Sequence, residues 1–117
     1  MKRESLFLYA SEHFNATPQY LWSKYPDYAV LRHNNKDSWF GLIMNVSGEK
    51  LRLIESKKVD ILNVKAKPEI VGSLRQMDGI YPAYHMNKEH WVSVRLDGPV
   101  SANEIYELLT ESYFLTL

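Results

Sequence analysis

The fold of this chain is decided by one stretch of sequence, Tyr81-Pro-Ala-Tyr-His-Met-Asn-Lys-Glu-His-Trp-Val-Ser-Val-Arg-Leu96. It contains two of the four histidines and one of the three tryptophans in the chain. From Trp91 onward the side chains alternate in type, which is the pattern of a strand with two different faces. The polar segment from Asn87 to Glu89 precedes this strand and is typical of a turn. The stretch therefore predicts a strand, a tight turn and a second strand.

A hairpin is expected earlier in the chain. Residues 28–33 and 38–46 both have strand character, and Asn34-Asn35-Lys36-Asp37 between them is turn-forming. In the strand over 38–46 we expect one face to carry Phe40, Leu42, Met44 and Val46, and the other to carry Trp39, Gly41, Ile43 and Asn45.

A third strand is expected over residues 59–66, with Leu62, Val64 and Ala66 facing inward. If the strands pair with their faces in step, one face of the sheet combines Trp39, Asn63, Lys65, Trp91 and Arg95. Aromatic rings interleaved with cations form surfaces that stack bases and contact phosphates. The alternative is that Trp39, Ile43 and Trp91 are core residues beneath the N-terminal helix, and we favour this alternative slightly.

The N-terminal part of the chain predicts helix. Over residues 5–15, Ser5 can serve as N-cap, and Phe7, Ala10 and Phe14 recur at helical spacing on one face. After Pro18, residues 19–24 predict one short helical turn.

Two more helices are expected towards the C-terminus. One begins at Pro68 and ends at Met77, where Asp78-Gly79 supplies the stop. The last begins at Ser101, which forms a capping box with Glu104, and runs to about Phe114. The order of elements predicts a single α+β domain over residues 1–117, with a mainly antiparallel sheet and about three helices segregated on it.

Composition excludes several classes of protein. The 117 residues contain no cysteine, which excludes a disulfide framework, a thiol nucleophile and a cysteine-ligated metal site. The apolar run from Leu6 to Ala10 is too short for a signal peptide, and no run approaches the ~20 apolar residues of a membrane span. We therefore expect a soluble cytoplasmic protein without a membrane partner.

Charge is balanced overall but uneven along the chain. Fourteen basic and fourteen acidic residues give a formal net charge of zero, whereas nucleic-acid-binding domains usually have a basic excess. From Lys50 to Arg75, however, seven basic residues stand against three acidic ones, and from Gly98 onward there are three glutamates and no lysine or arginine. The middle of the chain is basic and its end is acidic.

Residues 22–116 resemble the MmcQ/YjbR-like family of small bacterial proteins. The resemblance lies in Val59-Asp-Ile-Leu-Asn-Val-Lys65, in residues 68–75, in the string from Tyr81 to Trp91, in Leu96-Asp-Gly98 and in the closing helix. It implies a double-wing fold like that of DNA-binding proteins and, by that likeness alone, DNA binding. The resemblance brings no catalytic motif.

Nine residues are candidates for contact with nucleic acid: Lys65, Lys67, Arg75, His85, Asn87, Lys88, His90, Trp91 and Arg95. Lysines beside the start of a helix at Pro68 can hold phosphate, and Asn87 and Lys88 can present an amide and a cation from a turn. Each also has a structural interpretation, as a charged edge, a turn residue or core. His85 and His90 lack the spacing of a metal site, so hydrogen bonding within the turn is the simpler role for them.

The sequence thus predicts a non-enzymatic, monomeric binding module without a cofactor or metal, whose partner is DNA. The alternative is a domain that binds a protein or a small ligand and keeps the fold without binding nucleic acid. No nucleophile motif or glycine-rich phosphate loop supports catalysis.

Overall fold

Five antiparallel strands form one open sheet in the computed structural model, which describes residues 1–54 and 56–117. The strands are β1 (Ala29–Arg32), β2 (Trp39–Ser47), β3 (Lys58–Lys65), β4 (Ile80–Pro82) and β5 (Trp91–Arg95). Their order across the sheet is β1-β2-β3-β5-β4, so the hairpin of β4 and β5 completes one edge. The hairpin predicted around residues 34–37 joins β1 to β2.

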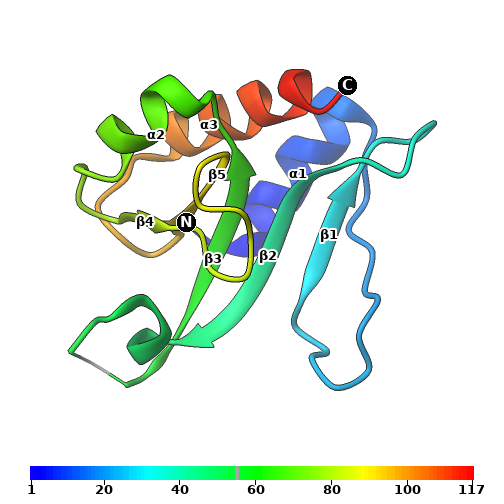
Figure 1. Ribbon diagram of the computed structural model, residues 1–117. Helices are drawn as coiled ribbons and strands as arrows, with labels where there is room; N and C mark the ends of the chain where they lie inside the picture. The colour runs from blue at the N-terminus through cyan, green and yellow to red at the C-terminus, as the bar shows by residue number, and fades with distance from the viewer. Residues whose placement is uncertain (55) are drawn as a thin grey trace.

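Three helices lie on one face of this sheet (Figure 1): α1 (Arg3–Phe14), α2 (Pro68–Leu74) and α3 (Ala102–Leu115). Their apolar side chains form the main core with those of the strands, and Leu6, Phe40 and Leu109 in it are fully buried. The predicted α+β class with a mainly antiparallel sheet is therefore confirmed. No helix within the described ranges is long and apolar enough to cross a membrane.

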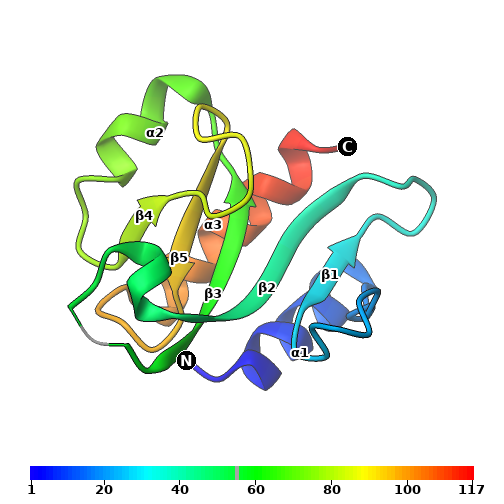
Figure 2. The same ribbon diagram turned by 60° about the horizontal axis from the view of Figure 1, so that its bottom comes forward.

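The other face of the sheet carries a second apolar cluster without a long helix over it. Its buried members are Val30, Leu42, Met44, Val46, Leu51, Val59 and Ile61. The short 3-10 helix η1 (Gly48–Leu51) and the loop over residues 83–90 lie on this side, as Figure 2 shows. Partly buried aromatic side chains from two loops pack against the cluster, including those of Trp22, Tyr28 and Tyr84. We call this side the loop-covered face.

A bulge in β2 moves Trp39 onto the loop-covered face. Leu31 pairs with Gly41, but the next residue, Arg32, pairs with Trp39, so one residue of β2 is left over. Phe40 consequently packs into the helix-side core, and Trp39 joins Leu42 and Met44 on the opposite side. The predicted alternation of β2 is thus wrong at Phe40 and Trp39, because a regular period of two cannot continue through a bulge.

The expected placement of Trp39 and Trp91 beneath the N-terminal helix is also wrong. Trp91 alternates with Val92, which lies in the helix-side core, so both tryptophans are on the loop-covered face. Ile43 alone of that predicted trio lies on the helix side. The predicted aromatic and charged residues do share one face of the sheet. Asn63 pairs with Ser93, and Lys65 pairs with Trp91, so the faces of β3 and β5 are in step as the prediction assumed.

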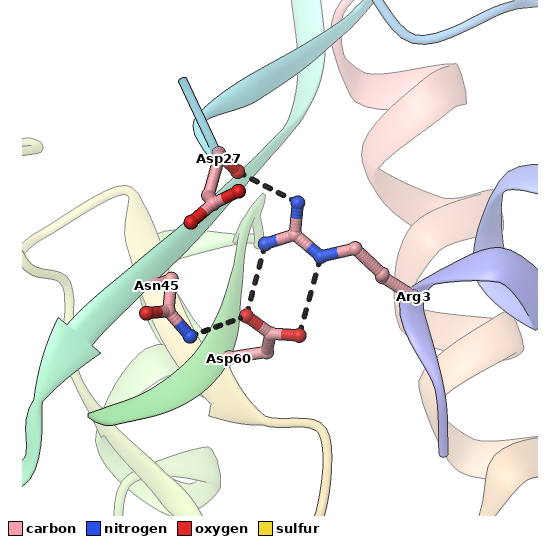
Figure 3. A network of polar contacts seen from close by, with 4 residues as sticks. All are labelled: Arg3, Asp27, Asn45 and Asp60. Atoms are coloured by element: carbon pink, nitrogen blue, oxygen red, sulfur yellow. Dashed lines mark hydrogen bonds and ion pairs between the residues drawn. The ribbon is translucent and has the colours of Figure 1, made fainter. Parts of the chain in front are cut away.

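An arginine at the start of α1 ties this helix to the sheet (Figure 3). Its guanidinium donates through Nε and Nη2 to the two carboxylate oxygens of Asp60 at 3.2 and 2.9 Å, and through Nη1 to the carbonyl oxygen of Asp27 at 2.7 Å. Asn45 Nδ2 also donates to Asp60, at 2.9 Å. Arg3 therefore joins α1, β3 and the segment before β1 by a bidentate ion pair, the strongest geometry for this pair of groups.

Several predicted boundaries at the N-terminus are wrong. Helix α1 starts at Arg3, with Lys2 rather than Ser5 at the N-cap position, and Leu6 and Ala10 are its buried residues. Residues 19–24 form no helix: Gln19 makes a bridge with Val30, with mutual backbone hydrogen bonds of 3.0 and 2.9 Å, and the Tyr25 amide donates to the Trp22 carbonyl at 3.2 Å to close a single turn. Hydrogen bonds of the strand type thus satisfy the backbone N–H and C=O groups of Gln19.

The second helix and the hairpin at β4 also differ from prediction. Helix α2 ends at Leu74, three residues before Met77. The connection between β4 and β5 spans residues 83–90 and is not a tight turn. The predicted N-cap Ser101 is confirmed, since Ser101 Oγ accepts from the Glu104 amide at 3.2 Å, and it also donates to the Glu104 carboxylate at 3.2 Å.

Candidate functional site

An aromatic hollow of about 580 Å³ opens on the loop-covered face. Its volume is within the range of small-molecule and cofactor pockets. Leu42 and Met44 of β2 lie at it, together with aromatic residues from two loops. The residues that line it are Trp22, Tyr25, Tyr28, Trp39, Leu42, Met44, Asn45, Val46, Ser47, Lys50, Lys58, Tyr84, His85 and Met86. We call it the aromatic hollow.

The rings around this hollow hold one another in place. Trp22 meets Trp39 edge to face, with centroids 5.8 Å apart and planes at 88°, and meets Tyr28 in the same way at 6.1 Å. Tyr25 stacks on Tyr28 at 4.7 Å. Aromatic pairs of these geometries stabilise by about 0.5–1.5 kcal/mol each beyond area burial. The segment over residues 22–28 is therefore a packed aromatic wall although it has no regular secondary structure.

Burial affects the chemistry of one phenol in this wall. The pKa of Tyr28 is raised above its ordinary value, first by burial and then by the neighbouring Tyr84 and Tyr25 hydroxyl groups. The phenol therefore stays neutral and can donate a hydrogen bond at physiological pH.

A cationic hollow of about 430 Å³ adjoins the aromatic one. Four cations line it, Lys50, Arg52, Arg75 and Lys88, with Leu51, Tyr81, Pro82, Ala83 and Tyr84. Its lining, drawn from the residues that the structure describes, includes no carboxylate. Within residues 1–54 and 56–117, none of the four cations forms an ion pair. We call it the cationic hollow.

The two hollows share part of their walls. Lys50 and Tyr84 line both of them, so the aromatic and cationic regions form neighbouring parts of one surface. His85 at one hollow and Arg52 at the other have left-handed backbones, with φ of 59° and 63°. Such conformations are unfavourable for residues with a Cβ and cluster at functional sites. Asn15 is the other described non-glycine residue with positive φ.

A buried polar pair fixes the loop that carries Tyr84. The side chains of Asn63 and Ser93 are fully buried, and Ser93 Oγ donates to Asn63 Oδ1. Asn63 Nδ2 donates to the carbonyl oxygen of Tyr84 at 2.8 Å, and Ser93 Oγ accepts from the Tyr84 amide at 2.9 Å. Asn63 is thus a support for the loop-covered face and is sealed off from any ligand.

Three of the nine predicted contact residues border these hollows. Arg75 and Lys88 line the cationic hollow, although they lie 13 positions apart in sequence, and His85 lines the aromatic hollow. His85 also packs on the Tyr84 ring, with centroids 3.9 Å apart. The structure therefore brings together a subset of the prediction.

The other predicted residues lie elsewhere or have structural partners. Lys65 pairs with Trp91 across β3 and β5, and the backbone oxygen of His90 accepts from the Ala66 amide at 2.9 Å. Lys67 Nζ lies 3.8 Å from a Glu111 carboxylate oxygen, at the opposite end of α2 from Arg75.

Arg95 and Asn87 also have observed structural roles. Arg95 Nε donates to Asp97 Oδ1 at 2.6 Å, and this hydrogen bond lowers the pKa of the Asp97 carboxyl below its ordinary value. Asn87 Oδ1 accepts from the Glu89 amide at 2.8 Å, which is the local turn that asparagine favours. Among the described residues, no group of three or more histidine and acidic side chains is placed to hold a metal ion.

Sequence reasoning missed most of the aromatic wall. The sequence pattern assigns Trp22 to an expected helical turn, Tyr25 to its end and Tyr28 to the start of an expected strand, and it assigns Lys50 and Arg52 only to a local charge excess. The available signal was four aromatic residues within nine positions, from Tyr20 to Tyr28, in a segment that also contains Pro26. A loop so rich in aromatic side chains needs an apolar surface to pack on.

Comparisons with known proteins agree with this fold. The family model described as YjbR matches residues 12–115. Uncharacterized protein YyaQ of Bacillus subtilis is 47% identical over 116 residues, which cover 99% of this chain and 98% of that protein. A crystal structure of a Pseudomonas syringae protein is 47% identical and matches the whole of both chains with a TM-score of 0.97. The Deinococcus radiodurans protein DR2400, described as a DUF419 domain, is 28% identical with a TM-score of 0.73, over 97% of this chain and 77% of that one.

Proposed function

The chain belongs to the YjbR family, and we propose that it is a non-enzymatic DNA-binding protein whose cationic hollow contacts phosphates. The observation that supports this most strongly is the convergence of Lys50, Arg52, Arg75 and Lys88 on one hollow without a described carboxylate in its lining. Side chains that contact phosphate position a nucleic acid independently of its sequence. The likeness of the family to double-wing DNA-binding proteins supports the proposal at the level of fold only.

The four cations concentrate positive charge at one hollow, which is compatible with a net charge of zero for the whole chain. The cations come from η1 and the residue after it, from the residue after α2 and from the loop over 83–90, so no single segment would appear strongly basic. Lys65, Lys67 and Arg95, which were predicted as phosphate contacts, are not part of this hollow. The revised set of contacts is therefore smaller and more concentrated than the predicted one.

Titration of duplex DNA at several salt concentrations tests the proposal. Four phosphate contacts predict a slope of about −3.6 in a plot of log K against log salt, or roughly 150-fold weaker binding at 200 mM than at 50 mM salt. The double variant Arg75→Gln/Lys88→Gln should reduce the magnitude of the slope by about half. Lys2→Gln, an exposed cation at the start of α1, is the matched control. Absence of binding at low salt, or binding without a salt dependence, would contradict the proposal.

A second candidate function is the binding of a free small ligand, and the aromatic hollow is the observation that favours it. A planar molecule could enter between the aromatic wall and Tyr84 without any nucleic acid. A thermal-shift screen of planar anionic compounds tests this, since a ligand at 100 times its Kd stabilises the fold by about 2.7 kcal/mol. Stabilisation by such a compound, with no response to DNA, would favour this function over the first.

A further inference from the structure

The junction of the two hollows indicates which form of DNA the surface accepts. Lys50 and Tyr84 belong to both linings, so the two hollows lie side by side with these residues between them. The aromatic side offers ring faces and edges, and the cationic side offers four positive charges. A ligand that satisfies both sides has a planar aromatic group next to an anionic group.

Each nucleotide of a DNA strand has a planar base next to an anionic phosphate, but in a duplex the faces of the base are not accessible. In a duplex the faces of the bases are stacked on one another and only their edges are accessible in the grooves. An aromatic hollow can receive a base only when the base is unpaired and free to stack on protein rings. The cationic hollow alone makes no such distinction, because both forms of DNA present phosphates.

Two polar side chains of β2 at the aromatic hollow are engaged within the protein. Asn45 Nδ2 donates to Asp60, and Ser47 Oγ donates to the carbonyl oxygen of Ser56 at 2.9 Å. The rings of Trp22, Tyr25, Tyr28 and Tyr84 line the hollow, and stacking on rings tolerates any base. The hollow is suited to binding with little sequence preference.

We propose that the surface binds single-stranded DNA, with one unpaired base in the aromatic hollow and its adjacent phosphate among the several that the cations of the cationic hollow contact. This inference rests on the proposed function and specifies its ligand. Trp22 and Tyr25 form the stacking wall, and Arg75 and Lys88 hold the phosphate. The rest of the strand lies over the loop-covered face.

Fluorescence anisotropy with a labelled oligothymidine strand, compared with a labelled duplex of the same length, tests the proposal. The single strand should bind at least ~10-fold more tightly than the duplex at the same salt concentration, because one stacked base contributes this much or more. Binding should also change the intrinsic tryptophan fluorescence, since Trp22 and Trp39 line the hollow. Equal or tighter binding of the duplex would overturn the inference while leaving the proposed function standing.

Two variants locate the stacking site. Trp22→Leu should weaken single-strand binding by about 10-fold and leave duplex binding unchanged. Because Trp22 is partly buried, Tyr25→Ser provides a second variant that removes a ring 52% exposed to solvent. Phe114→Leu, which alters an exposed ring on α3 at the other face of the sheet, is the matched control. Unchanged single-strand affinity in both Trp22→Leu and Tyr25→Ser would overturn the inference.

Two further outcomes separate this inference from its premises. If neither single strand nor duplex binds at low salt, both the proposed function and the inference are wrong. If free thymidine monophosphate competes as well as the oligothymidine strand, the hollow binds a small ligand, and the inference is overturned in favour of the second candidate function. The double variant Arg75→Gln/Lys88→Gln should weaken single-strand and duplex binding alike.

Discussion

At the scale of single residues, one buried imidazole joins the sheet to the last helix. His33 at the end of the first hairpin strand is 4% exposed, and its ring packs between those of Phe40 and Tyr113, with centroids 5.1 and 4.4 Å away. Its Nε2 forms a hydrogen bond of 2.8 Å with Thr116 Oγ1, so it joins the sheet to the end of α3. Burial, followed by the positive charge of Lys36, lowers the pKa of His33 below the ordinary imidazole value.

This lowered pKa predicts acid sensitivity at a defined position. The unfolded chain binds a proton at His33 more readily than the native protein does, so the native state loses stability as the pH falls below about 6.5. The loss continues down to the pKa of His33 in the native state and then ceases, and above pH 7 the term is absent. In urea unfolding between pH 8 and 5, His33→Gln should lack this decrease, although it loses about 1 kcal/mol at pH 7 with the Thr116 contact. His13→Gln, an exposed imidazole on α1, is the control, and equal pH dependence of His33→Gln and wild type would contradict the prediction.

At the scale of secondary-structure elements, the loop over residues 83–90 has no regular structure, yet side chains of β3 and β5 fix its position by hydrogen bonds. The Asn63–Ser93 pair bonds both the amide and the carbonyl of Tyr84. Tyr84 in turn lines both hollows. The strands therefore position the loop, and through it the shared wall of the candidate site.

Ser93→Ala should release this loop selectively. The substitution leaves the Tyr84 amide and Asn63 Oδ1 without their partner, which costs about 1–3 kcal/mol when such groups stay buried. We expect hydrogen exchange at the Tyr84 amide to accelerate at least ~10-fold and ligand affinity at both hollows to fall. Ser101→Ala, which removes the N-cap of α3, is a control of similar destabilisation remote from the loop. Equal protection of Tyr84 in the Ser93→Ala variant and in the wild type would show that the loop is held by other contacts.

The elements of this fold were more predictable than the candidate site. The period of the apolar residues identified β3, β5 and α3, and the Ser101–Glu104 spacing identified the start of α3 correctly. The bulge at Phe40 could not be predicted from the sequence of β2 alone. It arises because Arg32 of β1 pairs with Trp39 and leaves Phe40 without a partner in the register. The site depends on loops that meet only after folding, so Lys50, Arg75 and Lys88 could be recognised as basic but not as neighbours.

At the scale of the whole molecule, one sheet supports two apolar clusters, one on each face. β2 and β3 contribute to both, with Ile43 and Leu62 on the helix side and Met44 and Ile61 on the other. All three tryptophans lie on the loop-covered face, whereas the three helices lie on the opposite face. Tryptophan fluorescence and helical circular dichroism therefore report on different sides of the same sheet.

The shared strands predict that both sides unfold together. In urea, tryptophan fluorescence and ellipticity at 222 nm should give the same midpoint and the same free energy of unfolding, as in a two-state transition. Leu109→Ala on the helix side and Met44→Ala on the other should each lower the free energy of unfolding by about 2–5 kcal/mol and shift both midpoints in parallel, because a cavity on either face weakens the strands that both faces need. A fluorescence midpoint below the ellipticity midpoint, most of all in Met44→Ala, would mean instead that the loop-covered face opens by itself. In that case the aromatic hollow would have to form before it could bind a ligand. The apparent affinity would then be reduced by the fraction of molecules in which the hollow is formed.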